Sequence, residues 1–397
     1  EPLATPSGGT TPAQTAPMEA ARARRRSLAV GAAGAAIGVA AMALLAWQLL
    51  RPKPLNITIS DITPVTNEPG VEFQPAISPD GKEVAYVAGP IGAPHLVIRK
   101  TANVAGGGEA RPADSSLLRE WYPSWSPDGD FVRFLACRAA GCAWNETGSL
   151  GGTVQPVQLP QRAMARVVAW SPDGTRIAFI VADTIFASSA ADTTPRRVTV
   201  HRTQFSRTPF MALHSLAWSP DGRQIAYVNG NALWRSSGNV ASSSIWVVSA
   251  QGGEPRQVAG EGFLNVSPAW LDARRLLFVS NRDGPQRGVY VVEVGPHGRR
   301  GQPRLVPGVA EPHSISYAID ARRLAYARFT YRQNIWEYPL GRSTAISIKD
   351  GRPVTSGSQV IELPDVSPDG RWLVFGSDRR GNMDLYKVPV AGGDAMP

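Results

Sequence analysis

The sequence has few cysteines, few histidines and little charge. Its 397 residues include 2 cysteines and 5 histidines, and charged residues make up 18% of the chain. Two cysteines cannot hold a scaffold of this size together, so a hydrophobic core has to stabilise the fold. The histidines lack a metal-binding spacing such as H-E-x-x-H, and we expect no metal and no other cofactor.

Catalytic motifs are also missing from the sequence. No serine lies on the G-x-S-x-G elbow of a serine hydrolase. Of the kinase motifs, the Gly-rich phosphate loop, the H-R-D loop and D-F-G do not occur, and His201-Arg202-Thr203 lacks the aspartate. The chain is therefore not expected to be an enzyme by itself.

Positive charge is in excess but spread along the chain. The formal net charge is +9, and the arginines are scattered, often in turns that follow Asp-Gly. A nucleic-acid-binding surface needs basic residues that cluster on one face. We therefore expect no nucleic-acid partner.

One long apolar run lies near the N-terminus, at residues 28–50. It contains no charged side chain, and about 20 helical residues cross the roughly 30 Å hydrocarbon core of a membrane. More basic residues precede the run than follow it: Arg22, Arg24, Arg25 and Arg26 against Arg51 and Lys53. The length of the run predicts one transmembrane helix. The positive-inside rule places residues 1–27 in the cytoplasm, as a disordered linker, and the remainder outside it.

The length and the glycines of this run bear on its role. The run exceeds the core of a typical signal peptide, about 7–15 residues, and no A-x-A cleavage site follows it. We therefore expect a retained anchor in contact with lipid, the alternative being a cleaved signal. Gly34 and Gly38 form a G-x-x-x-G pair, which predicts a homodimer, although such pairs also arise by chance in an Ala/Gly-rich span.

Internal repeats fill residues 57–397, after a short linker at 51–56. The tetrapeptide Ser-Pro-Asp-Gly occurs five times, and two worn copies keep only the aspartate. Proline presets φ in such a turn, aspartate binds its own backbone and glycine accepts positive φ. The seven repeat aspartates, 45–51 residues apart, are Asp80, Asp128, Asp173, Asp221, Asp272, Asp320 and Asp369.

Each repeat holds four short strand patterns. An apolar strand precedes the turn, a second strand follows it, a third carries aromatic and β-branched residues such as Ile245–Val248, and a fourth follows a Gly-Gly turn. Four strands per repeat in series predict an all-β propeller of about seven four-stranded blades, with six to eight compatible with the spacing. Residues 57–62 could close the ring, but we favour a chain that continues beyond Pro397.

The repeats resemble those of TolB-like proteins, in which W-S-P-D-G is followed by I-A-F/Y. The matching residues are Trp125–Gly129, Trp170–Gly174 with Ile177-Ala178-Phe179, and Trp218–Gly222 with Ile225-Ala226-Tyr227. The resemblance covers about 340 residues and implies a TolB-like β-propeller. It does not specify a function, because propellers host many unrelated activities.

The order of linker, basic flank, span and propeller resembles the C-terminal part of bacterial receptor-type Ser/Thr protein kinases. This resemblance implies a cytoplasmic kinase domain upstream of Glu1, a location in the bacterial inner membrane, and a periplasmic sensory propeller that binds a ligand or a protein. Two alternatives remain open. The propeller could be an envelope scaffold that docks proteins, or the exported part of a membrane-bound winged-helix transcription regulator.

One position of the repeat supplies the candidate ligand site. In TolB-like blades the residue about seven before the repeat aspartate leads into the innermost strand, near one mouth of the central channel. A ring of aromatic, His, Arg and Glu side chains there suits a small polar ligand or a peptide of an envelope protein. The alternative is that these side chains cap strands or bind one another through water. The residues are Phe73, Trp121, Arg166, His214, Asn265, His313 and Glu362.

The two cysteines lie close together in the second repeat. Cys137 and Cys142 bracket four residues between the second and third strand patterns. Outside the cytoplasm such a pair can cross-link a hairpin. We predict a Cys137–Cys142 disulfide rather than a zinc site, since partner ligands are missing.

Overall fold

The structure is a computed structural model. It describes residues 38, 41–42, 57–66, 71–90, 92–102, 109–160, 167–189, 194–201, 213–231, 241–260, 262–284, 286–328, 333–339, 347–357, 359–380 and 383–397. Within these residues no helix is long and apolar enough to cross a membrane. Most of the predicted span, the linkers at 1–27 and 51–56, and Arg166 lie outside them. The chain divides into two units, Glu1–Ile57 and Thr58–Pro397.

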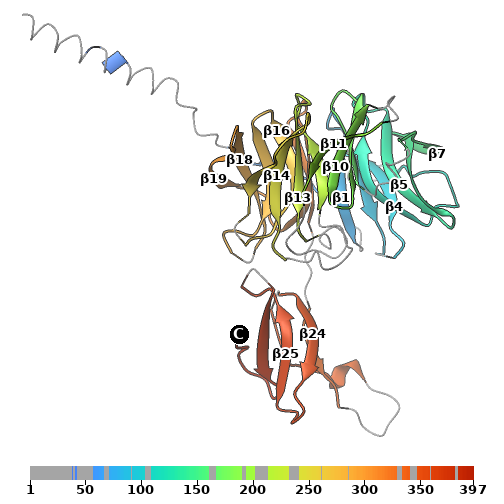
Figure 1. Ribbon diagram of the computed structural model, residues 1–397. Helices are drawn as coiled ribbons and strands as arrows, with labels where there is room; N and C mark the ends of the chain where they lie inside the picture. The colour runs from blue at the N-terminus through green and yellow to red at the C-terminus, as the bar shows by residue number, and fades with distance from the viewer. Residues whose placement is uncertain are drawn as a thin grey trace, which may run out of the picture. The chain divides into compact units, whose positions relative to one another are not determined.

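The first four repeats of the second unit each form one antiparallel sheet, with strands paired in sequence order (Figure 1). The first sheet is β1 (Glu72–Ile77), β2 (Glu83–Ala88) and β3 (His95–Lys100). The second is β4 (Arg119–Trp125), β5 (Phe131–Arg138), β6 (Gly141–Gly148) and β7 (Gly151–Pro156). The third is β8 (Val168–Trp170), β9 (Arg176–Val181), β10 (Thr184–Ser189) and β11 (Arg196–Val200). The fourth is β12 (Leu213–Trp218), β13 (Gln224–Asn229), β14 (Ser244–Ser249) and β15 (Arg256–Ala259).

The fifth repeat follows the same pattern, and the sixth and seventh repeats depart from it. The fifth sheet is β16 (Asn265–Asp272), β17 (Arg275–Ser280), β18 (Gly288–Gly295) and β19 (Gly298–Val306). The sixth repeat contributes the pair β20 (Pro312–Ala318) and β21 (Arg323–Arg328), and a separate pair β22 (Trp336–Glu337) and β23 (Arg352–Pro353), with the 3-10 helix η2 (Ile348–Asp350) between its strands. The last sheet is β24 (Ile361–Val366), β25 (Trp372–Ser377) and β26 (Asp384–Pro389).

The Ser-Pro-Asp-Gly turn is fixed by hydrogen bonds that its own residues make. In the first repeat the Ser78 hydroxyl donates to Asp80 Oδ1 (2.7 Å), and the Lys82 N–H donates to the same oxygen (3.1 Å). The Glu83 N–H then donates to Ser78 Oγ (2.9 Å) and starts the next strand. Gly81 has φ +72°, where a Cβ would be strained. The repeated aspartates are therefore turn-forming residues.

These hydrogen bonds predict a loss of stability in acid. They lower the pKa of Asp80 to about 2, chiefly through the Lys82 N–H and the Ser78 hydroxyl, and the Ser171 hydroxyl and Thr175 N–H do the same for Asp173. Because the folded-state pKa is depressed, this stabilisation is complete above the unfolded value near 4 and disappears as the pH falls toward 2.

The melting temperature should therefore drop between about pH 4 and pH 2, measured by circular dichroism. Asp173→Asn should flatten part of that slope. A slope that this variant leaves unchanged would contradict this account.

Tryptophans of the turn-preceding strands link the second, fourth and fifth sheets to the sheet before each of them. The Trp125 indole N–H donates to Ala76 O (2.8 Å), Trp218 to Ala169 O (3.1 Å), and Trp270 to Ala217 O (3.0 Å). Between the second and third sheets, the rings of Trp144 and Trp170 meet edge to face at 5.1 Å. The tryptophan that precedes the repeat turn thus connects neighbouring blades.

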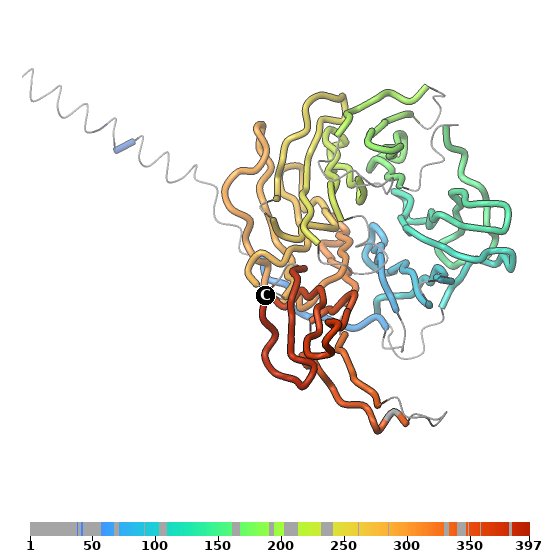
Figure 2. Tube along the Cα trace, turned by 60° about the horizontal axis from the view of Figure 1, so that its bottom comes forward, coloured from blue at the N-terminus to red at the C-terminus, as the bar shows by residue number. Residues whose placement is uncertain are grey.

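The ring of sheets closes with the sixth repeat. The Ile315 N–H donates to Ser267 Oγ of the fifth sheet (2.9 Å), and the Ile77 N–H of the first sheet donates to Ser316 Oγ (3.1 Å). Ala318 packs in one cluster with Ile77, Val84, Tyr86 and Val97. Figure 2 shows the succession of sheets around a common axis, from blue through green to orange. Strands β20 and β21 thus directly contact the first sheet, and the last sheet is not inserted between them.

Residues 57–66, which include the segment considered for closing the ring, contain no strand. The Ile59 N–H donates to Pro307 O (3.1 Å), just after β19. Arg99 donates to Val65 O (3.4 Å). The segment therefore contacts the fifth and first sheets without completing a blade.

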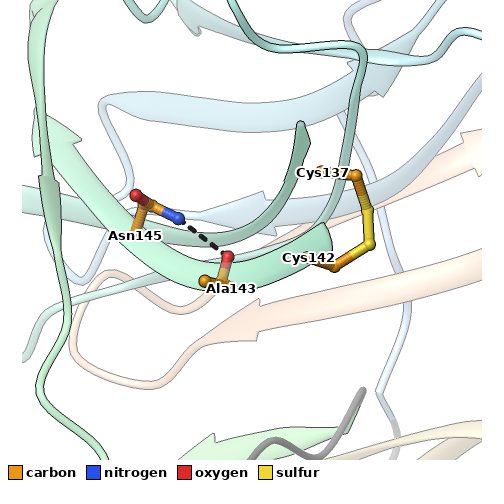
Figure 3. Close-up of a disulfide and its surroundings, with 4 residues drawn as sticks. All are labelled: Cys137, Cys142, Ala143 and Asn145. Atoms are coloured by element: carbon orange, nitrogen blue, oxygen red, sulfur yellow. Dashed lines mark hydrogen bonds between the residues drawn. A yellow bond between two sulfur atoms is a disulfide. The ribbon is translucent and has the colours of Figure 1, made fainter. Parts of the chain in front are cut away.

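The two cysteines form a disulfide across one hairpin. Cys137 on β5 and Cys142 on β6 are direct partners in the strand register, and their sulfurs are bonded at 2.05 Å (Figure 3). On the same strand as Cys142, the Asn145 side-chain amide donates to Ala143 O at 2.7 Å. The bridge closes a short loop at the end of the second blade.

Removing this bridge should cost a moderate amount of stability. A loop of about six residues corresponds to about 2 kcal/mol in the chain-entropy description of disulfides. We expect the double variant Cys137→Ala, Cys142→Ala to lower the free energy of unfolding by about that amount in urea titrations. Reductant should have the same effect on the native chain and none on the variant; a reductant effect on both would contradict the prediction.

Candidate functional site

A cavity of about 300 Å³ lies on the ring axis. All six inner strands of the ring contribute to it. The lining residues are Gln74, Pro75, Tyr122, Pro123, Ser124, Trp125, Val167, Val168, Ala169, Trp170, Ser215, Leu216, Ala217, Trp218, Ser267, His313, Ser314 and Ile315. The size is at the lower end of the range for small-molecule sites, about 300–1,000 Å³.

A β-bulge in the inner strands aims side chains at this cavity. Gln74, Tyr122, Ser215 and Ser267 all have positive φ, between 52° and 60°. Each lies where the register between the first and second strands shifts. A bulge inserts one residue and reverses the alternation of side chains after it. In the first, second and fourth blades, a residue of the cavity wall is therefore the one that follows the predicted position; in the fifth blade it is Ser267, two residues after Asn265.

Hydrogen bonds hold several of these polar side chains in place. The Tyr122 N–H donates to Gln74 Oε1 (2.8 Å) across the first two blades. Ser267 Oγ accepts from the Ile315 N–H, as described above. Ser124 Oγ is buried and has no hydrogen-bond partner among the described residues. Its hydroxyl is an unsatisfied polar atom in the wall of the cavity.

The described part of the cavity wall is electrically neutral apart from one histidine. None of its 18 described lining residues is Asp, Glu, Lys or Arg. The nearby guanidinium groups of Arg133 and Arg176 stack on Trp170 and Trp218, 5.0 and 4.8 Å from the ring centroids. Burying an unpaired charge in such a place is costly, whereas an uncharged polar group can be satisfied by hydroxyl and backbone groups.

Two of the predicted site residues meet between the first two blades. Phe73 is buried, Trp121 is half-buried, and their ring centroids are 5.5 Å apart. Neither side chain belongs to the cavity lining. Their neighbours Gln74 and Tyr122 do belong to it.

Two further predicted residues are buried in hydrogen-bond networks. His214 Nε2 donates to Gly230 O (2.9 Å), and its Nδ1 lies 2.8 Å from Ser215 Oγ. The Asn265 amide donates to Ser243 O (2.8 Å) and Phe263 O (3.0 Å). These contacts fit the strand-capping alternative, and a ligand role for the two residues stays a prediction.

The other predicted residues differ in placement. His313 lines the cavity, with Nδ1 3.2 Å from Ser314 Oγ. Glu362 lies on β24 of the last sheet, opposite Gly376, and is not part of the cavity lining. Arg166 is outside the described residues. Among the described residues no group of three or more His, Cys, Asp or Glu side chains could hold a metal ion.

Comparisons with known proteins agree with this architecture. The family model "Lipoprotein LpqB beta-propeller domain" matches residues 58–204, which span the first three blades. An uncharacterized protein of Agrobacterium fabrum is 28% identical over 93 residues, or 23% of this chain, and the match spans only 30% of that relative.

Solved structures of TolB proteins are also similar. A protein described as a TolB from Agrobacterium tumefaciens is 18% identical, with a TM-score of 0.47 over 67% of this chain and 93% of that one. TolB from Acinetobacter baumannii is 18% identical, with a TM-score of 0.43 over 60% of this chain and 57% of that one. The sheet order, the ring of inner strands and the repeat turns define the second unit as a TolB-like β-propeller.

Proposed function

We propose that the chain is a membrane-anchored binding module whose propeller channel accommodates an uncharged polar group. That group belongs to a small ligand or to a loop of an envelope protein. The observation that carries the proposal is the cavity that all six inner strands line and whose described lining residues include no Asp, Glu, Lys or Arg. The indoles of Trp125 and Trp170, which belong to the lining, would contact the guest.

The proposed location follows from the sequence. The apolar run at 28–50, with more arginines before it than after it, supports one inner-membrane span with an extracytoplasmic propeller. We further propose that an upstream cytoplasmic kinase domain uses the propeller as its sensor; the order of segments supports this. Reading the coding sequence upstream of Glu1 tests it, because a winged helix or the absence of kinase motifs there would contradict it.

The binding proposal is tested by thermal shift with residues 58–397. A bound compound at 100 times its dissociation constant adds about 2.7 kcal/mol to the folded state. We expect neutral disaccharides or end-blocked peptides to raise the melting temperature, and their anionic and cationic analogues to have no effect. A flat response to all neutral probes, or a preference for charged ones, would count against the proposal.

A matched pair of variants locates the binding. Ser314→Lys places a cation in the cavity wall and should abolish the shift. Ser242→Lys makes the same change at an exposed position outside the lining and should retain it. If both variants bind alike, the channel is not the site.

A further inference from the structure

The last sheet is built like a ring blade but has one uncovered face. Leu385 pairs with Gly376, and in the first five sheets the residues at this register position are Leu96, Trp144, Ile185, Ile245 and Val289. Those five are at most 4% exposed, whereas Leu385 is 68% exposed.

The ring shows what normally covers this face. Leu96 and Ile98 of the first sheet pack in one cluster with Val132 and Phe134 of the second. Ile185 of the third sheet likewise clusters with residues of the fourth. The face that carries Leu385 is thus the one that the following blade covers.

The opposite face of the last sheet is already covered. Phe375 and Tyr386 cluster with Ile335 and Val354, which belong to the sixth repeat. Ile335 and Trp336 carry the β-branched and aromatic pattern of a third strand in the sixth repeat. Among the described residues, the sheet of that blade consists of β20 and β21, while β22 and β23 pair with each other. The outer half of the sixth repeat therefore packs on the last sheet in the way that a preceding blade would.

We infer that the open face of the last sheet is a docking surface for the first blade of the same chain. The ring would open between β20–β21 and β1, β22 would pair with β21, and the last sheet would enter as a seventh blade. The surface formed by Ile77, Val84, Tyr86 and Val97, now covered by Ala318, is the matching one. It continues the interface that the sixth and first repeats already share.

The exchange replaces one contact between neighbouring blades with another of the same kind and also buries more apolar surface. It breaks the contact of the Ile77 N–H with Ser316 Oγ and that of Arg323 with Gly81 O (3.1 Å). It covers Leu385 and gives β21 a partner strand. Burying a leucine side chain is favourable, so the seven-bladed ring is an accessible second state of the chain.

Distances measured by pulsed electron-electron double resonance on the full chain test this inference. The native cysteines are bonded to each other, so nitroxides can be placed on pairs of introduced cysteines. The pair Lys82→Cys and Arg371→Cys reports the distance between the first and last repeat turns, and both native side chains are 80% exposed. Lys82→Cys with Asp130→Cys serves as the neighbouring-blade reference, and Lys82→Cys with Arg322→Cys reports the six-bladed closure.

We expect the distance distribution of the Lys82–Arg371 pair to contain a component at the reference distance. The short-distance component of the Lys82–Arg322 pair should be smaller by the same fraction. Leu385→Asp should reduce that component at least twofold, whereas Leu305→Asp, a change at another exposed leucine (50%), should not. Absence of the component would overturn the inference. A component that disappears on dilution with unlabelled chain would also overturn it, since the occupant would then be a second copy.

Discussion

Trp218→Ala is expected to lower the free energy of unfolding by about 3–5 kcal/mol, the usual cost of removing a large buried aromatic side chain. Trp218 is 7% exposed and belongs to the cluster that joins the third and fourth blades. Its indole N–H donates across that interface to Ala169 O, and Arg176 stacks on its ring. The substitution therefore leaves a cavity and removes an interblade hydrogen bond at the same place.

A matched control separates the interblade role from the general loss of a tryptophan. Trp336 is 51% exposed, so Trp336→Ala should change the free energy of unfolding by less than about 1 kcal/mol. Trp218→Phe should fall between the two, because it keeps most of the packing but loses the hydrogen bond. Urea unfolding followed by tryptophan fluorescence and by circular dichroism measures the free energy of unfolding of all three variants. Equal effects of the two alanine variants would refute the role of Trp218 in connecting blades.

Two truncations should differ sharply in stability. A chain of residues 58–328 keeps both strands that close the ring, and we expect it to unfold cooperatively within a few degrees of the longer chain. A chain of residues 58–311 lacks β20 and β21 and exposes the apolar side chains of Tyr86 and Val97. Because each blade is stabilised mainly by its neighbours, the loss of one neighbour at the closure should prevent cooperative unfolding or lower the melting temperature by more than 10 °C.

Differential scanning calorimetry of the two truncated chains decides this prediction. The shorter chain should also bind a hydrophobic dye, since the face of the first blade is uncovered. Equal melting temperatures for the two chains would mean that the sixth repeat does not stabilise the ring. Loss of folding in both would mean that residues beyond Arg328 are needed for closure.

Local features of this fold were predictable from the sequence. The Ser-Pro-Asp-Gly turns and their flanking strands depend on contacts within a few residues, such as Ser78 with Asp80, and the all-β propeller follows from their repetition. The number of blades in the ring depends instead on which repeat reaches the first one. Ser316 meets Ile77 through a contact that no local pattern encodes.

In three blades the predicted position lies next to a residue of the cavity wall. The sequence indicated Phe73, Trp121 and His214 as the positions nearest the channel, and the structure places Gln74, Tyr122 and Ser215 on its wall. The difference comes from the bulge, which reverses the side-chain alternation. Non-glycine residues with positive φ are hard to recognise in a sequence, because glutamine, tyrosine and serine give no sign of that conformation.

The closing contact also has a consequence for how the ring assembles. Ile77 and Ser316 are 239 residues apart in the chain, and Gly81 and Arg323 are 242 apart, whereas every blade is made of neighbouring hairpins. Contacts between distant residues form slowly, because the loop entropy must be lost before they are gained. Hairpins and blades should therefore fold early and the seam between the first and sixth blades last. In hydrogen exchange the same seam should open first, with a smaller free energy than the rest of the ring.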